Sequence, residues 1–299
     1  MPGLSISVVI PAYNEQEAVG PVVEGVGLAL GGRVGEFEII VVDDGSTDGT
    51  AEAARKSGAT VLSHPVNRGY GQALTTGIQA AQHEWMLMID ADSSYPTTEI
   101  PKLLEFAPAF DLVIGARTGA HFWGSSAQAF RRKVYIKMTA FIVGEAIPDA
   151  NSGLRLVRRS LALATGPVNC LGYSFTTTMT LSFLKAGRFV KYVPIAFQVR
   201  TGKSKIRPTR DILRALQIMT QVLIAYNPLK LFVTLASLPG IIGLLLWLGY
   251  LGNGSGFWLL CSTLCGLAAL QCFMTGCLLD SIRMHSHPHN TPNRDPRRL

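Results

Sequence analysis

The chain has 299 residues, a length that allows one or two domains with a well-packed core. Its composition is 48% hydrophobic and only 16% charged, and residues 1–110 have a net charge of −9 whereas residues 111–299 have a net charge of +16. An acidic first half argues against nucleic-acid binding, and the basic second half favours contact with anionic lipid or with a lipid phosphate.

The first part of the chain alternates short apolar runs with helical patterns. Strands are expected at residues 5–10, where Pro11 ends the run, and at 38–42, 60–63, 85–89 and 111–115. A first helix is expected to run to about residue 30, capped by Asn14 or by the neighbouring turn, and further helices are expected at residues 50–57 and 71–81. Continuous apolar strands that alternate with helices predict an α/β fold with a mostly parallel sheet covered on both faces.

Pairs of carboxylates follow two of these strands. Asp90 and Asp92 come directly after one strand, and Asp43 and Asp44 end another. A lone Asp-x-Asp is as compatible with a solvated turn as with a site, but the carboxyl ends of parallel strands meet at one edge of a sheet. Carboxylates placed there suit a hard divalent cation held against phosphate oxygens. The two acidic strand ends therefore predict a metal-assisted phosphate site.

A glycine-containing segment, Asn67-Arg68-Gly69-Tyr70-Gly71, precedes the third helix. It lacks the third glycine of a dinucleotide-binding fingerprint, so its match to that motif is weak. Its arginine is nevertheless expected at the same edge of the sheet as the carboxylates, and this arrangement is compatible with a nucleotide site.

The C-terminal third carries no charged residue between Lys230 and Asp280. Residues 231–251 and 257–279 are each long enough to cross a hydrocarbon core of about 30 Å as a helix. Basic residues flank the pair on both sides and the connecting loop has no charge, so both flanks are expected in the cytoplasm. The start of the chain lacks the pattern of a signal peptide. These features predict an integral protein of the cell membrane whose main domain and both termini are cytoplasmic.

Two segments alternate basic and apolar residues, at about 128–147 and 205–228. Both patterns favour amphipathic helices in the membrane interface, with ordinary surface helices as the alternative. The expected organisation is a main domain at residues 1–204, a juxtamembrane helix at 205–228, a two-helix transmembrane hairpin at 229–280 and a basic tail at 281–299.

Several segments resemble the motifs of family 2 glycosyltransferases with a GT-A fold, namely residues 7–15, 42–50 and 90–92. Three more are similar to the dolichol-phosphate mannosyltransferase group, the polyprenyl-phosphate sugar synthases, namely residues 149–155, 172–175 and 200–205. The motifs occur in the right order, and the resemblance extends from residue 5 to about residue 228.

The resemblance implies an inverting, metal-dependent transfer of a sugar from a nucleoside-diphosphate-sugar to polyprenyl phosphate, dolichyl or undecaprenyl, at the cytoplasmic membrane face. It implies Mg²⁺ or Mn²⁺ as cofactor and membrane lipid as a partner. The small residues Gly240 and Gly243 in the first span are compatible with a homo-oligomer.

The resemblance also assigns roles to residues. The donor nucleotide is expected to contact Pro11, Tyr13, Glu15, Asp43, Asp44 and Arg68. Asp90 and Asp92 are expected to be catalytic through the metal, with Ser94 as a further ligand. The acceptor phosphate is expected to contact Arg117, Arg131, Arg132, Arg155, Arg200, Ser204 and Lys205.

Two positions depart from the family pattern. Ser94 stands where much of the group has a metal-binding glutamine, and Thr176-Thr177-Thr178 stands where a Gln-x-Glu is common. The missing carboxylate is compatible with a phosphate acceptor, which is ionised at pH 7 and needs no general base.

Two alternatives remain. One is a transferase that extends a polysaccharide or glycolipid, although the sequence lacks the Gln-x-x-Arg-Trp motif of processive synthases. The other is a non-catalytic membrane module, which only the two departures support.

Overall fold

The computed structural model describes residues 3–164, 175–198 and 227–286, with single positions between 217 and 224. The chain divides into two compact units, residues 1–208 and 209–299. Most of the helix expected at 205–228, and the tail beyond residue 286, lie outside the described residues.

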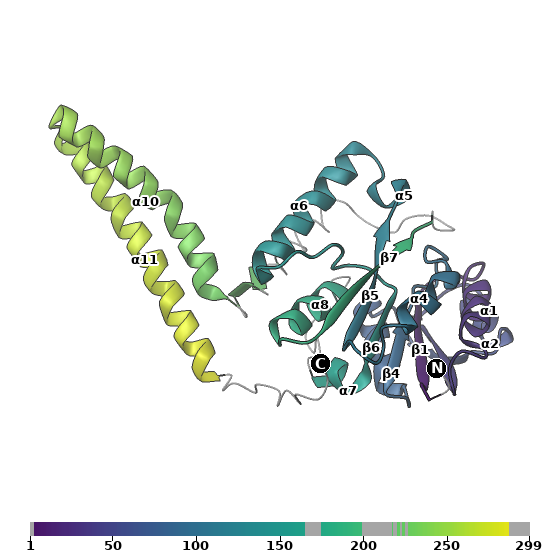
Figure 1. Ribbon diagram of the computed structural model, residues 1–299. Coiled ribbons are helices and arrows are strands. Elements are labelled where there is room, and N and C mark those ends of the chain that lie inside the picture. The colour runs from purple at the N-terminus through teal and green to yellow at the C-terminus, as the bar shows by residue number, and fades with distance from the viewer. Residues whose placement is uncertain are drawn as a thin grey trace. The chain divides into compact units, whose positions relative to one another are not determined.

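The first unit is built on a seven-stranded sheet with the strand order β3-β2-β1-β4-β6-β5-β7 (Figure 1). The strands are β1 (Ile6–Ala12), β2 (Phe37–Asp43), β3 (Thr60–Ser63), β4 (Trp85–Met88), β5 (Leu112–Thr118), β6 (Arg155–Arg158) and β7 (Val190–Ala196). Strand β6 runs antiparallel to its neighbours β4 and β5, and the other pairings are parallel. The expected mostly parallel α/β sheet is confirmed, and β6 and β7 are additions to it.

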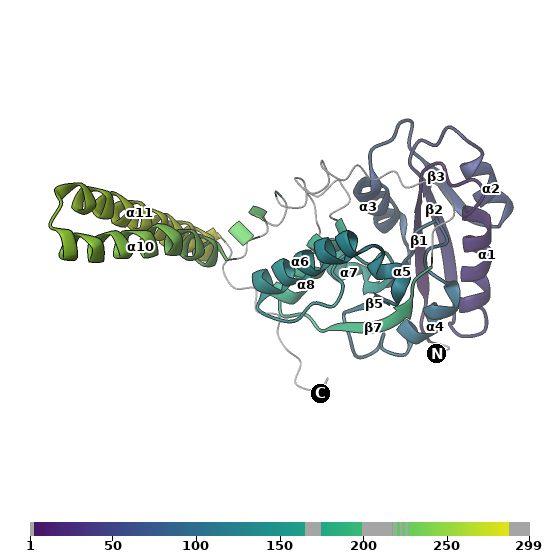
Figure 2. The ribbon, with the colours of Figure 1, turned by 90° about the horizontal axis from the view of Figure 1, so that it is seen from above.

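Helices cover both faces of the sheet because its strands are apolar on both sides. They are α1 (Val19–Leu30), α2 (Thr50–Lys56), α3 (Tyr70–Ala80), the 3-10 turn η1 (Thr97–Glu99), α4 (Ile100–Leu104), α5 (Ala120–Trp123), α6 (Ser126–Val143), α7 (Arg159–Ala164) and α8 (Phe175–Lys185). In β4, Trp85 and Leu87 join the core beneath α1 and α4, whereas Met86 and Met88 join the core beneath α3 and α8. Figure 2 shows α1 and α3 on opposite sides of the sheet.

Strand β1 does not end at Pro11, as the sequence analysis expected, but continues to Ala12. The pairing of β1 with β4 stops at Val9, and beyond it β1 pairs only with β2. Proline is tolerated where its missing N–H is not needed by a ladder. The strand therefore carries its loop further toward the edge where the carboxylates lie.

Helix α3 packs unusually close to β1. A Cβ atom added to Gly77 would lie 2.2 Å from Cγ1 of Val9, so only glycine fits there. This close approach places the first residue of α3, Tyr70, near the carboxyl edge of the sheet.

Helix α6 begins two residues earlier and ends four residues earlier than the expected 128–147. Ser125 caps it by accepting from the Gln128 N–H at 3.4 Å, and the Gln128 side chain accepts from the Ser125 N–H at 3.0 Å. This reciprocal capping box fixes the start of the helix.

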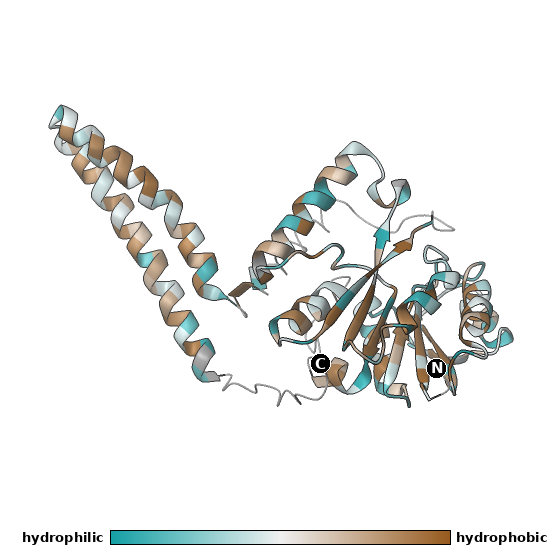
Figure 3. Ribbon diagram, viewed as in Figure 1, coloured by the Kyte–Doolittle hydropathy of each residue, from teal (hydrophilic) through white to brown (hydrophobic). Residues whose placement is uncertain are grey.

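The second unit contains two long helices, α10 (Pro228–Asn253) and α11 (Gly256–Ser286), which form a hairpin. Their most apolar windows have mean hydropathies of 2.2 and 1.7, with 6% and 0% of the residues buried, so both are long and apolar enough to cross a membrane. Figure 3 shows the apolar colouring along both helices. The Ser262 hydroxyl donates to the Gly243 carbonyl oxygen at 2.9 Å, which joins the two helices.

Candidate active site

The loops that follow β1 and β2 are bound to each other. The backbone N–H of Asn14 donates to the Ser46 hydroxyl at 2.9 Å, and the Asn14 side-chain oxygen accepts from the Thr47 N–H at 2.8 Å. Asn14 has a φ of 52° and does not cap α1, which begins at Val19 after the turn that follows Glu15. Of the expected donor-binding residues, Tyr13 and Glu15 belong to the first of these loops, and Pro11 lies just before it in β1.

Asp44 holds the glycine-containing loop in place. Its buried carboxylate accepts from the N–H groups of Arg68 at 3.0 Å and Gly69 at 2.8 Å, and it contacts Nδ1 of His64 at 2.7 Å. The other ring nitrogen of His64 contacts the Thr76 hydroxyl at 3.0 Å. Asp44 therefore organises the loop around Arg68, and contact of either residue with a nucleotide stays a prediction. His64 is not among the residues predicted from the sequence, where its only signal is a polar residue directly after a short strand.

Asp43 lies beside this loop at the end of β2. Its Oδ1 accepts from the Ser46 N–H at 3.0 Å, and the residue is buried. Both acidic strand ends thus reach the same edge, as the parallel pairing of β2, β1 and β4 requires.

The second acidic pair, Asp90 and Asp92, follows β4. Burial, and then the negative charge of Asp92, raise the pKa of Asp90 to about 6, although a hydrogen bond from Tyr70 opposes the rise. The Tyr70 hydroxyl donates to Oδ1 of Asp90 at 2.8 Å. Oδ1 of Asp92 accepts from the hydroxyl of Ser94 at 2.6 Å and from its N–H at 3.1 Å.

A divalent cation fits this pair. Two adjacent carboxylates, one of them desolvated, are stabilised by a hard cation that offsets their repulsion. The described residues include no group of three His, Cys, Asp or Glu side chains suited to a metal. The other ligands would then be diphosphate oxygens and water, an arrangement typical of Mg²⁺. Ser94 contacts Asp92 in this structure, and its own role as a ligand stays a prediction.

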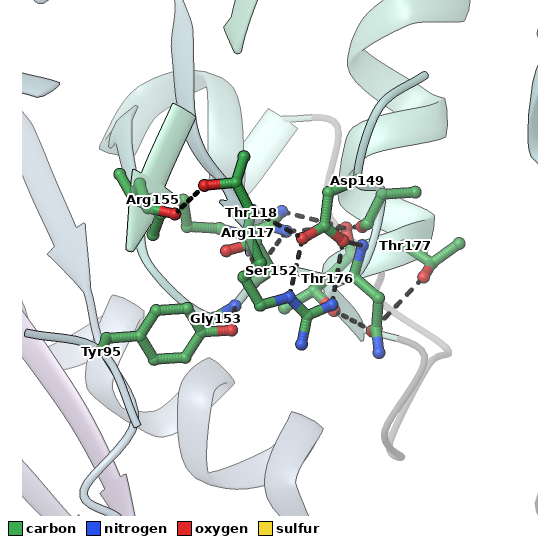
Figure 4. A network of polar contacts seen from close by, with 12 residues as sticks. Tyr95, Arg117, Thr118, Asp149, Ser152, Gly153, Arg155, Thr176 and Thr177 are labelled. Carbon is green, nitrogen blue, oxygen red and sulfur yellow. Dashed lines mark hydrogen bonds and ion pairs between the residues drawn. The ribbon is translucent and has the colours of Figure 1, made fainter. Parts of the chain in front are cut away.

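A salt bridge lies on the other side of the site. Nε and Nη2 of Arg117 donate to the two carboxylate oxygens of Asp149 at 2.7 and 2.9 Å, and the Arg117 N–H donates to the same carboxylate at 3.2 Å (Figure 4). Burial lowers the pKa of Arg117, but Tyr95 and Asp149 raise it by a larger amount, so its net shift is upward. The guanidinium group is thus fixed and fully charged.

A second arginine lies near the first. The guanidinium groups of Arg117 and Arg132 lie 5.0 and 4.9 Å from the ring centre of Phe122. Burial, and then the positive charge of Arg117, lower the pKa of Arg132, and its buried Nη1 has no hydrogen-bond partner among the described residues. Two neighbouring cations with an unused donor favour an anion as their ligand. Arg131, next along α6, is exposed.

Arg155 has a different environment. It is 0% exposed, and its guanidinium donates to the carbonyl oxygens of Ser152 at 2.6 and 3.0 Å and of Thr176 at 3.0 Å. These contacts favour a role in holding the segment 149–153, which we call the Asp149 loop. Direct contact of Arg155 with an acceptor stays a prediction.

The threonines of α8 bind the same loop. The Thr176 hydroxyl donates to the Asn151 side-chain oxygen at 2.7 Å, and the Thr177 hydroxyl contacts the hydroxyl of Tyr135 on α6. The departure from the Gln-x-Glu pattern therefore supplies loop contacts in place of a carboxylate. The structure thus brings most of the expected site residues to one edge of the sheet, whereas Arg200, Ser204 and Lys205 lie outside the described residues.

The fold and its acidic edge define the GT-A class, and comparison with solved structures agrees. The chain resembles glucosyl-3-phosphoglycerate synthase from Mycobacterium tuberculosis, crystallised with Mn²⁺, uridine-diphosphate-glucose and phosphoglyceric acid, with a TM-score of 0.58, 24% identity and coverage of 75% of this chain and 80% of that one. Mannosyl-3-phosphoglycerate synthase from Rubrobacter xylanophilus gives a TM-score of 0.57 at 22% identity, over 74% and 73% of the two chains.

Sequence comparisons identify the family. The family model described as "Glycosyl transferase family 2" matches residues 7–164, more than half of the chain, and the protein belongs to this family. A dolichyl-phosphate hexose transferase from Haloferax volcanii is 29% identical over 68% of this chain and 87% of the relative. An undecaprenyl-phosphate 4-deoxy-4-formamido-L-arabinose transferase from Serratia proteamaculans is 29% identical over 81% and 74%. This chain spans about half the length of some other relatives with the latter name.

Proposed function

We propose that this family 2 glycosyltransferase moves a sugar, with inversion, from a nucleoside-diphosphate-sugar to polyprenyl phosphate at the cytoplasmic face of the membrane. The observation that carries the proposal is electrostatic. The basic pair Arg117 and Arg132 lies at one end of the Asp149 loop, and the acidic pair Asp90 and Asp92 lies at the other end, where Gly153 is against the Asp90 carboxylate. Such a site has one half for a metal-bound diphosphate and one half for a phosphate acceptor.

The donor half is formed by the ends of β1, β2 and β4. In this proposal Asp43, the linked loops and the segment held by Asp44 would hold the nucleotide, and Asp90 and Asp92 would hold Mg²⁺ or Mn²⁺; the contacts that join these loops support the assignment. When bound, the cation offsets the negative charge that develops on the departing nucleoside diphosphate. The Mn²⁺ in the M. tuberculosis synthase supports a divalent cation without deciding between the two metals.

The acceptor half is formed by β5 and α6. Arg117 and Arg132 would bind the phosphate, whose oxygen forms a bond to the anomeric carbon of the sugar; their shared position beside Phe122 supports this assignment. The bond from that carbon to the nucleoside diphosphate breaks at the same time, and its electron pair leaves with the diphosphate. An acceptor phosphate that is already ionised has no proton to lose, which is compatible with threonines at the place of a general base.

The lipid part of the acceptor calls for a membrane surface. Helix α6 exposes Phe130, Val134 and Phe141, at 68%, 40% and 44%, and carries basic residues between them. Spacings of four and seven residues place these apolar side chains along one stripe of the helix. This stripe and the hairpin of α10 and α11 support a protein inserted in the membrane with its site near the cytoplasmic surface. The names of the relatives, which include dolichyl-phosphate and undecaprenyl-phosphate transferases, support the choice of acceptor.

The test is transfer from a panel of radiolabelled UDP- and GDP-sugars to undecaprenyl or dolichyl phosphate, with purified full-length protein and Mg²⁺ or Mn²⁺. A single acid-labile sugar in the organic phase, from one donor, is the expected result. A growing chain would instead support the extending transferase. Nucleotide binding without transfer from any donor would support the non-catalytic module.

A further inference from the structure

We propose that Tyr70 and Gly153 are positioning residues that hold the Asp90 carboxylate between them in the orientation needed to bind the metal. This inference rests on the proposed function, because it concerns the metal half of the same site. Neither Tyr70 nor Gly153 is proposed to contact the substrate.

Tyr70 holds the carboxylate from one side. Its hydroxyl donates to Oδ1 of Asp90 at 2.8 Å, and it is the first residue of α3. The preceding N–H groups, of Arg68 and Gly69, are bound to the buried Asp44. The tyrosine is therefore anchored at the start of its helix and does not depend on its own side chain for position. A rigid donor of this kind fixes the position of Oδ1 of Asp90.

Gly153 limits the carboxylate from the other side. A Cβ atom at Gly153 would lie 2.4 Å from Oδ2 of Asp90 and 2.7 Å from both Cγ and Oδ1. The φ of Gly153 lies outside the left-handed range, so its backbone does not itself require glycine. The three atoms nearest to such a Cβ all belong to the Asp90 carboxylate group, which therefore requires glycine here.

Gly153 is itself fixed in position. Its N–H donates to the Tyr95 hydroxyl at 2.7 Å, a buried contact visible in Figure 4. It ends the Asp149 loop, whose other end binds Arg117. The loop thus touches the acceptor-side arginine at one end and the metal-side carboxylate at the other. Residues that orient a metal ligand in this way typically change metal affinity or activity by about 10- to 100-fold when they are mutated.

The first test measures Mn²⁺ binding by electron paramagnetic resonance on purified full-length protein, with Mn²⁺ alone and with added UDP or GDP. We expect Tyr70→Phe to weaken Mn²⁺ binding about tenfold. Tyr192→Phe is the matched control, because the buried Tyr192 hydroxyl has no hydrogen-bond partner among the described residues. It should bind Mn²⁺ as the wild type does.

The second test measures the Gly153 contact without any metal. In EDTA, Gly153→Ala should lower the melting temperature by at least about 3 °C, because the new methyl group displaces the carboxylate. In an Asp90→Ala background the same substitution should lower the melting temperature much less, since the obstructing carboxylate atoms are gone. This double-mutant cycle does not depend on sugar transfer or on metal binding.

The outcomes separate the two proposals. If the wild type binds Mn²⁺ and Tyr70→Phe binds it equally well, the role of Tyr70 is overturned while the proposed function stands. If Gly153→Ala lowers the melting temperature equally with and without the Asp90 carboxylate, the role of Gly153 is overturned. If the wild type binds no Mn²⁺, alone or with either nucleotide, the proposed metal site fails and the inference fails with it.

Discussion

Asp149 binds the guanidinium group of Arg117 through both of its carboxylate oxygens, at 2.7 and 2.9 Å, and also accepts from the backbone N–H of Arg117. The carboxylate is buried, and the pair joins the end of β5 to the loop that ends beside Asp90. A buried bidentate pair of this kind fixes the position of a cation. The guanidinium stays protonated, but the carboxylate offsets part of its positive charge. Arg117 is therefore suited to orient an acceptor phosphate while Arg132 supplies the less compensated charge.

The first prediction concerns this pair. Asp149→Asn should destabilise the protein by about 3 kcal/mol, because it leaves a buried guanidinium without its counter-charge. It should also raise the KM for polyprenyl phosphate more than the KM for the sugar donor. Denaturant unfolding and steady-state kinetics measure the two effects. The double change Arg117→Gln with Asp149→Asn should destabilise the protein by less than the sum of the two single changes. Strictly additive losses of stability would contradict an interaction between the two side chains.

The second prediction concerns the like charges of Asp90 and Asp92. Asp92→Asn should raise the melting temperature in EDTA, because it removes the repulsion that helps to raise the pKa of Asp90. It should lower transfer activity by roughly a hundredfold or more, because the metal loses a carboxylate ligand. Asparagine can still accept the hydrogen bonds from Ser94, so the change isolates the charge. Full activity of a folded, membrane-inserted Asp92→Asn protein would refute the proposed metal role.

The sequence predicts the sheet edge and its acidic residues well because the apolar runs before Asp43 and Asp90 alternate with helices. It does not predict β6, whose four residues begin and end with arginine and pair at long range with β4 and β5. Two partners of Asp44 are backbone N–H groups, 24 and 25 residues further along the chain, which no residue type reveals. Arg155 illustrates the same limit, since a basic residue in a family motif turns out to bind carbonyl oxygens in the interior.

The third prediction concerns the exposed apolar stripe of α6. Phe130→Glu and Phe141→Glu should each raise the KM for a long-chain polyprenyl phosphate in lipid vesicles by about tenfold, because an interfacial phenyl group is lost and a negative charge is added near lipid. The KM for a short, water-soluble prenyl phosphate should stay unchanged. Leu28→Glu on α1, where the side chain is 80% exposed, is the matched control. Equal effects on both acceptors would show that the stripe acts through folding and not through the membrane.

The last prediction concerns the orientation of the hairpin. Basic residues lie at the ends of α10 and α11 that are away from the connection between the two helices, and the connection itself carries no charge. The connection should therefore face away from the cytoplasm. With the native cysteines replaced, Asn253→Cys at the end of α10 should react with a membrane-impermeant maleimide in intact cells. Lys56→Cys, at an α2 position whose native side chain is 74% exposed, should react only after the cells are opened. The reverse pattern would place the sugar-transfer site on the outer face, where nucleotide sugars are not supplied, and would contradict the proposed donor as well as the topology.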